Sequence, residues 1–303
     1  MSDLLDAMKA SLADAEANKD QWQADLHEAA LKDPNNMRNW FPKVIASGVP
    51  YPETHFVELP AETWGDFING KPTERTISFV NQLKALCCIV GYPCFLRGTM
   101  MSAKHSWKDS CFIESEATNL HAHVYSIIET NEMAWGAFKP TAFAVRKMIP
   151  TVPAFYAFWG KMPVTKERRY FIKDGKVVCH HPYWPELSIE QPTPIGGFTP
   201  RTDNWWVPLL ALLNEEPEEE VRFLTQLAEM IGTVISGSWS VDFLQADDGS
   251  WFCIDMAVAE ESFHWPWCPN APESMKRYLE PKPDVDYEKL IKQEQRDEMK
   301  DDR

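Results

Sequence analysis

Two acidic residues stand inside short apolar stretches near the end of the chain. Asp242 lies within residues 240–243 and Asp255 within residues 253–256. Both stretches predict β-strands, and adjacent antiparallel strands would bring the two carboxylates together. A carboxylate in an apolar strand is costly to bury unless a cation compensates it, and Mg²⁺ prefers carboxylate and phosphate oxygens. We interpret the pair as a candidate magnesium site; the alternative is two solvent-exposed residues at strand ends.

Basic residues follow an earlier predicted strand. Arg97 ends that strand, and Lys104, His105 and Lys108 lie in the polar loop of residues 98–110. Cationic side chains on a loop after a strand are suited to neutralising phosphate. The loop is not a P-loop, because the chain has no G-x-x-x-x-G-K-[ST] motif. The alternative is an ordinary solvated surface loop.

A third group alternates along one predicted strand. Glu167, Arg169 and Phe171 would share one face of this strand, and Arg168 and Tyr170 the other, because side chains alternate across a sheet. A face that carries both Glu and Arg indicates a polar cleft.

Other polar residues carry a weaker signal. Neither histidine group has complete metal-ligand spacing, so packing or hydrogen bonding is the preferred interpretation. The seven cysteines include no C-x-x-C pair, which favours reduced thiols. The two histidine groups are His180 and His181 with Tyr183 and Trp184, and His264 after Glu260, Glu261 and Ser262.

These residues need strands and helices to hold them in place. Apolar periodicity predicts helices over residues 1–32, 74–90, 116–132, 206–213 and 218–235. Strand signals cover residues 55–59, 94–97, 143–149, 155–159, 167–172, 177–180, 239–244 and 251–256. Residues 173–176 predict a hairpin turn, and the strands after residue 143 predict a twisted antiparallel sheet.

Composition limits the class of protein. The 303 residues include 44% hydrophobic residues, which fits one compact catalytic unit. A net charge of -15 opposes extended nucleic-acid binding but allows a small basic pocket. The sequence has neither a run of about 20 apolar residues nor a signal-peptide layout, so we expect a soluble, cytoplasmic protein with no membrane partner.

Taken in order, these pieces resemble the ATP-grasp superfamily. The matching features are a basic strand and loop, a hinge strand, a Glu-x-Arg-x-Phe strand with an Asp-Gly turn, and a closing pair of Asp-bearing strands. The chain is similar to a phage and bacterial ATP-grasp group related to the clade of eukaryotic translation-initiation-factor assembly chaperones. This likeness covers residues 90–270, and a phage protein would act in the host cytoplasm. It rests on residues 95–97, 102–108, 162–163, 167–171, 180–185 and 254–257.

The resemblance implies an α+β ATP-grasp fold in which two α+β subdomains clasp ATP, preceded by a helical N-terminal region. It divides the chain into residues 1–90 as the N-terminal helical or pre-core region, 91–150 as the first subdomain, 151–272 as the second and 273–303 as a charged tail.

The resemblance also implies roles for individual residues. ATP and Mg²⁺ would be the cofactors, with Asp242 and Asp255 as metal ligands. ATP-grasp enzymes usually have a metal-binding Asn two residues after the acidic ligand, and this chain has Ala257 there, so Glu260 or Glu261 would replace it.

The remaining roles concern the nucleotide. Residues 146–149 would form the hinge strand beside adenine. Arg97 and Lys104 would lie near the phosphates, and Arg169 would face the transferred phosphate, so these three are the expected catalytic residues. The full expected cofactor-binding set is Arg97, Lys104, Lys108, Arg146, Met148, Ile149, Glu167 and Arg169.

The usual chemistry of the superfamily is phosphoryl transfer from ATP to a carboxylate, followed by attack of an amine. We therefore expect an ATP-dependent carboxylate–amine ligase that acts on a peptide, a protein or a small metabolite. One alternative is nucleic-acid end repair or RNA ligation at the ATP site, which the net charge disfavours. A second is a non-catalytic ATP-binding assembly factor.

Overall fold

The computed structural model describes residues 19–70, 72–133, 140–159, 161–197, 203–266, 268 and 270–272. They belong to two compact units, of which the first ends at Ser262 and the second starts at Phe263. The first part of the helix predicted over residues 1–32 lies outside the described residues, and its later part is α2, Lys19–Lys32. None of the described helices is long and apolar enough to cross a membrane.

The first sheet is antiparallel, with strand order β1-β4-β2-β3. Its strands are β1 Thr54–Glu58, β2 Cys94–Gly98, β3 Phe112–Ile113 and β4 Ala142–Lys147. Helices α4 Ala61–Ile68, α5 Glu74–Val90 and α6 Leu120–Met133 pack on it and share its apolar core. Because side chains alternate along a strand, Leu96 enters this core while its neighbour Arg97 lies on the opposite face.

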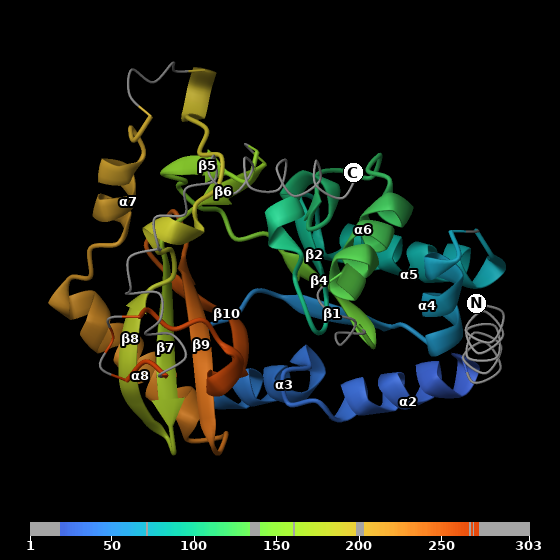
Figure 1. The fold of residues 1–303 in the computed structure, drawn as a ribbon, viewed down its shortest axis with the longest axis horizontal. Helices are drawn as coiled ribbons and strands as arrows, with labels where there is room; N and C mark the ends of the chain where they lie inside the picture. The colour runs from blue at the N-terminus through green and yellow to red at the C-terminus, as the bar shows by residue number, and fades with distance from the viewer. Residues whose placement is uncertain are drawn as a thin grey trace, which may run out of the picture. The chain divides into compact units, whose positions relative to one another are not determined.

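The second sheet is also antiparallel, with strand order β10-β9-β7-β8. Its strands are β7 Glu167–Lys173, β8 Lys176–Pro182, β9 Ser238–Gln245 and β10 Trp251–Val258. Helices α3 Met37–Ser47 and α8 Glu218–Gly232 complete its core (Figure 1). The β7–β8 turn is at the predicted place, and Asp174 and Gly175 have φ of 48° and 83°, as a tight hairpin turn requires.

A third, smaller layer lies beside the second sheet. It consists of the hairpin of β5 Phe155–Ala157 and β6 Met162–Val164, helix α7 Val207–Leu213 and the short turns η2 Glu186–Ser188 and η3 Ile195–Gly197. Its core is mainly aromatic and includes Phe155, Trp184 and Trp206. The basic loop forms the turn η1 Lys104–Asp109, which packs against β6.

Most predicted elements are present, with small shifts at their ends. Helices α3 and α4 and strands β3 and β6 were not predicted. Helix α3 contains Pro42, a residue that normally argues against a helix interior, and forms because Asn36 caps its first turn and one apolar face, with Trp40 and Val44, enters the core.

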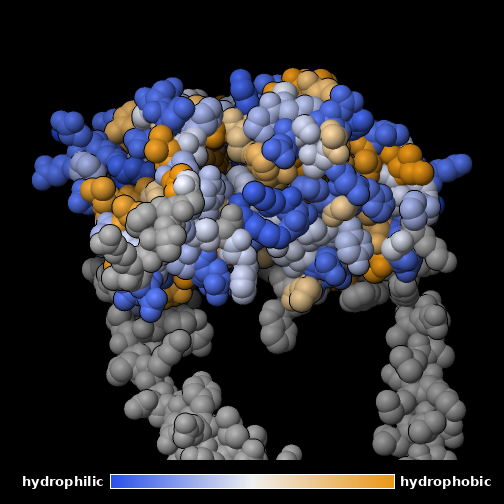
Figure 2. All heavy atoms as spheres, turned by 90° about the horizontal axis from the view of Figure 1, so that it is seen from above, coloured by the Kyte–Doolittle hydropathy of each residue, from blue (hydrophilic) through white to orange (hydrophobic). Residues whose placement is uncertain are grey.

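The N-terminal 90 residues are shared between both sheets. Strand β1 pairs with β4, and α4 and α5 share a core with β2, while α3 packs in the core of the second sheet. The boundary at residue 90 stays a prediction. On the surface seen in Figure 2, apolar side chains are scattered among polar ones rather than gathered in one patch.

Candidate active site

A cavity of about 590 Å³ is lined by residues from both sheets, a volume typical of small-molecule sites. Six cationic side chains and three carboxylates line it, so its balance opposes that of the acidic chain. The cations are Arg97, Lys104, Lys108, Arg146, Lys147 and Lys161, and the carboxylates are Glu167, Asp242 and Asp255.

Asp242 and Asp255 are brought together by an irregularity in β10. The strand pairs Cys253 with Phe243 and then Asp255 with Asp242, so that Ile254 is an extra residue. Directly opposed residues of an antiparallel pair lie on the same face of the sheet. The bulge therefore places both carboxylates on the cavity side.

Asp242 is paired with a guanidinium of the next strand. It is only 4% exposed, and Arg169 donates to its two oxygens from Nε and Nη2 at 2.7 and 2.8 Å. Burial alone would lower the pKa of Arg169, but the charge of Asp242 outweighs it and raises the pKa. Arg169 therefore stays charged and holds Asp242 as a carboxylate.

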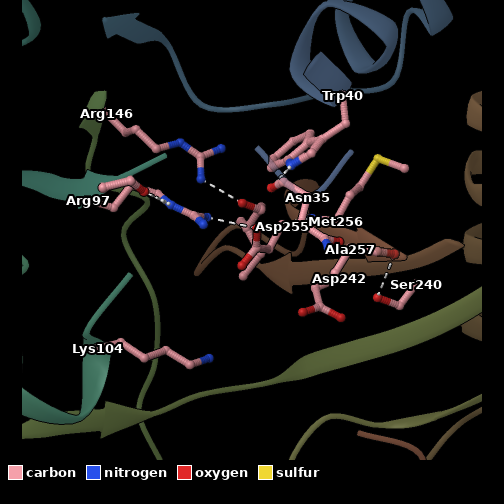
Figure 3. A network of polar contacts seen from close by, with 12 residues as sticks. Asn35, Trp40, Arg97, Lys104, Arg146, Ser240, Asp242, Asp255, Met256 and Ala257 are labelled. Atoms are coloured by element: carbon pink, nitrogen blue, oxygen red, sulfur yellow. Dashed lines mark hydrogen bonds and ion pairs between the residues drawn. The ribbon is translucent and has the colours of Figure 1, made fainter. Parts of the chain in front are cut away.

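Asp255 is paired with a residue of the first sheet. Arg97 is buried and donates from Nη1 to Asp255 Oδ1 at 2.8 Å. Arg146, on neighbouring β4, donates from Nη1 to the carbonyl of Ile254 at 2.6 Å. Figure 3 shows both arginines reaching toward Asp255 from the same side.

Lys104 lies among a carboxylate and two aromatic rings. Its Nζ is 3.4 Å from Glu167 Oε2 and lies over the rings of Tyr183 and Trp184, 3.9 and 4.7 Å from their centroids. Burial opposes the charge of Lys104, but Glu167 and Tyr183 outweigh it and raise its pKa. Burial raises the pKa of Glu167, and Lys104 only partly offsets this.

Apolar and aromatic groups form the rest of the wall. Met148 and Ile149 line the cavity directly after β4. Phe95 and Phe112 flank Trp107, with ring centroids 5.6 and 5.9 Å from it. Sequence reasoning missed these three rings, since an aromatic residue in a strand or loop usually indicates core packing.

Not every residue expected at the site lines the cavity. Lys108 lines it but is largely exposed, whereas His105 is exposed and stacks on Phe158. Glu260 is exposed in η4 Ala259–Glu261 and is not among the lining residues, so its role as a metal ligand stays a prediction. Glu261 accepts a hydrogen bond from Asn35.

Adjacent Arg168 points to the opposite face, as the alternation predicted. It is fully buried and donates to Glu220 at 2.6 Å, and to the carbonyls of Leu213 and Glu215 at 3.2 and 2.6 Å. It therefore belongs to the packing under α8 and not to the cavity.

The two sheets and this cavity define the ATP-grasp class, and the family comparison agrees. Residues 88–266, more than half of the chain, match the model of an ATP-grasp domain, the third family of its clade. The chain belongs to that family. No curated protein matches the sequence significantly.

Several solved structures resemble the chain at low sequence identity. C-terminally truncated Cdc123 from Schizosaccharomyces pombe shares 9% identity and a TM-score of 0.48, with 77% of this chain and 85% of that chain covered. A RimK domain ATP-grasp protein from Sphaerobacter thermophilus shares 13% and 0.40, with 83% and 65% covered. The ADP complex of PurK, an N5-carboxyaminoimidazole ribonucleotide synthetase, shares 13% and 0.44, with 77% and 47% covered. The chain thus spans less than two thirds of two of these three proteins.

Proposed function

We propose that this protein is a magnesium-dependent ligase that uses ATP to join a carboxylate to an amine through an acylphosphate. The acceptor would be a peptide, a protein or a small metabolite. The observation that carries the proposal is the opposed pair of Asp242 and Asp255 within a cavity lined mostly by cations. Membership of the ATP-grasp family supports a nucleotide as the anionic ligand.

The carboxylate pair fits a magnesium ion. Both side chains lie on the cavity face of adjacent strands, and Mg²⁺ is commonly held by one or two carboxylates together with substrate phosphates. Asp242 and Asp255 would hold the ion, which when bound would offset charge on the phosphate oxygens.

The nucleotide would extend from the apolar wall to the carboxylates. Met148 and Ile149, with the ring of Trp107, offer an apolar surface for a base. Lys104 and Arg97 offer cationic donors for the phosphates, and Arg169 adjoins the carboxylates from β7. Catalysis would rest on positioning and charge stabilisation, without a covalent enzyme intermediate.

The proposed reaction has two steps. An acceptor carboxylate oxygen forms a bond to the γ-phosphorus of ATP as the bond to the β–γ bridging oxygen breaks, and ADP leaves with that electron pair. The amine nitrogen then bonds to the acyl carbon, phosphate leaves, and the amine loses a proton. The cations of the cavity would stabilise the charge on the transferring phosphoryl group.

Trapping with hydroxylamine tests this chemistry. The protein is incubated with ATP, Mg²⁺, hydroxylamine and a panel of amino acids and short acidic peptides, and hydroxamate and ADP are measured. Formation of both in equal amounts, dependent on one class of carboxylate, supports the ligase. Formation of AMP that requires an RNA or DNA end would replace it with nucleic-acid repair, and ATP binding without turnover on any carboxylate would favour an assembly factor.

A further inference from the structure

The bulge in β10 leaves one backbone group without a partner in its own sheet. Ile254 has no paired residue on β9, and its carbonyl instead accepts a hydrogen bond from Arg146 Nη1 at 2.6 Å. Arg146 comes from β4, in the other sheet. A side chain of the first sheet therefore fixes the residue directly before Asp255.

Arg146 is an unusual cation for its surroundings. It is 3% exposed, its Nε donates to Thr54 Oγ1 at 3.2 Å, and its buried Nη2 has no partner. Among the described residues it forms no ion pair, in contrast to Arg97 and Arg169. Burial and the neighbouring Arg97 lower the pKa of Arg146 to about 10, so it remains charged at neutral pH. A buried cation with only neutral acceptors is costly, which points to a role beyond stability.

A second side chain holds the other end of the same segment. Asn35 Oδ1 accepts a hydrogen bond from the backbone N–H of Val258 at 2.7 Å, and its Nδ2 donates to Glu261 at 2.8 Å. Trp40 Nε1 donates to the carbonyl of Asn35 at 3.2 Å. Figure 3 shows Asn35 and Trp40 approaching this part of β10 from the side of α3.

We propose that Arg146 and Asn35 are positioning residues that hold residues 254–258 at both ends and so aim Asp255 at the metal. This inference rests on the proposed function, because it takes Asp255 as a metal ligand. Arg146 would thus act through the backbone of Ile254, whereas residues 148 and 149 adjoin the base. Groups that orient metal ligands in this way typically change metal affinity about 10- to 100-fold when removed.

The test is calorimetric titration with Mn²⁺, a probe for the magnesium site, in the presence and absence of ATP. It compares the wild type with Arg146→Met, Arg146→Lys and Asn35→Ala, and ATP affinity is also measured in EDTA. Arg75→Met is the matched control, because it removes the same charge at an exposed site paired with Asp66. Thermal unfolding of each variant identifies loss of fold.

We expect Arg146→Met and Asn35→Ala to weaken Mn²⁺ binding about tenfold or more, with metal-free ATP affinity unchanged. Arg146→Lys should recover much of this affinity, since it keeps a cationic donor for the Ile254 carbonyl. In an Asp255→Asn background, Arg146→Met should have no further effect on Mn²⁺.

Three results would overturn the inference. These are unchanged Mn²⁺ affinity in both variants, an equal loss of Mn²⁺ and metal-free ATP affinity in Arg146→Met, or an undiminished effect of Arg146→Met without Asp255. Absence of Mn²⁺ binding to the wild type, with ATP present, would instead show that the proposed function is wrong.

Discussion

Asp255 lies opposite Asp242 because β10 has one residue more than β9 at this point. Before the bulge, Cys253 faces the apolar core, and after it Met256 does. In an unbroken strand the residue two after Cys253 would also face the core, and that residue is Asp255. The extra residue Ile254 reverses the alternation and turns the carboxylate toward the cavity.

The neighbours Arg168 and Arg169 should separate stability from ligand binding. Arg168→Met removes a cation that serves Glu220 and the end of α7, so it should lower the free energy of unfolding by about 3 kcal/mol, as broken buried pairs do. ATP affinity should stay within about twofold. Urea unfolding and calorimetry measure the two quantities, and Arg168→Lys serves if the first variant does not fold.

Arg169→Met should affect both quantities. It leaves Asp242 buried without its bidentate partner and removes a cation beside the phosphates. Stability should fall by a similar amount, about 3 kcal/mol, and ATP affinity by at least about tenfold. Equal ATP affinities in the Arg168 and Arg169 variants would contradict the assignment of their faces.

Lys104 should contribute directly to ATP binding. Lys104→Ala removes a charged donor from the cavity and should weaken Mg–ATP binding about 10- to 100-fold. The control is Lys84→Ala, which removes an exposed lysine paired with Glu116 on the helical side of the first sheet. Equal affinities for the two variants would exclude Lys104 from the nucleotide site.

Glu167 should make stability depend on pH in the acid range. Burial raises its pKa above the ordinary 4.5, so between 4.5 and the raised value the folded state binds a proton that the unfolded state does not. The contribution of Glu167 is therefore greatest below pH 4.5 and is lost as the pH rises through the folded-state pKa. The pKa of Lys104 is raised from 10.5, so Lys104 does not titrate in this window.

The measurement is urea unfolding of the wild type and Glu167→Gln at pH 7.5, 6.5 and 5.5. The stability of the wild type relative to the variant should increase as the pH falls. A difference that stays constant or decreases would mean that the folded state does not raise the pKa of Glu167.

Residue periodicity predicted much of this fold. The alternation in β7 correctly placed Glu167 on the cavity face and Arg168 on the other, because period-two patterns depend only on local geometry. The Asp-Gly turn was also predicted, since few residues adopt positive φ.

Other features depend on contacts between distant segments. The bulge at Ile254 has no local signal, because the stretch reads as a regular strand until Arg146 takes its free carbonyl. Helix α3 was missed because tertiary packing of Trp40 outweighs the cost of Pro42. Asn35 was missed because its partner Val258 lies more than two hundred residues away.

The central claim is a magnesium–ATP site that contains Asp255, and calorimetric titration with ATP and a non-hydrolysable analogue, with and without Mg²⁺, tests it most directly. The titration compares the wild type, Asp255→Asn and the control Asp248→Asn, which changes the same charge in the exposed β9–β10 turn. We predict that Mg²⁺ strengthens binding about tenfold or more in the wild type and in Asp248→Asn, and not in Asp255→Asn. No nucleotide binding to the wild type, or an equal Mg²⁺ effect in all three proteins, would contradict the account.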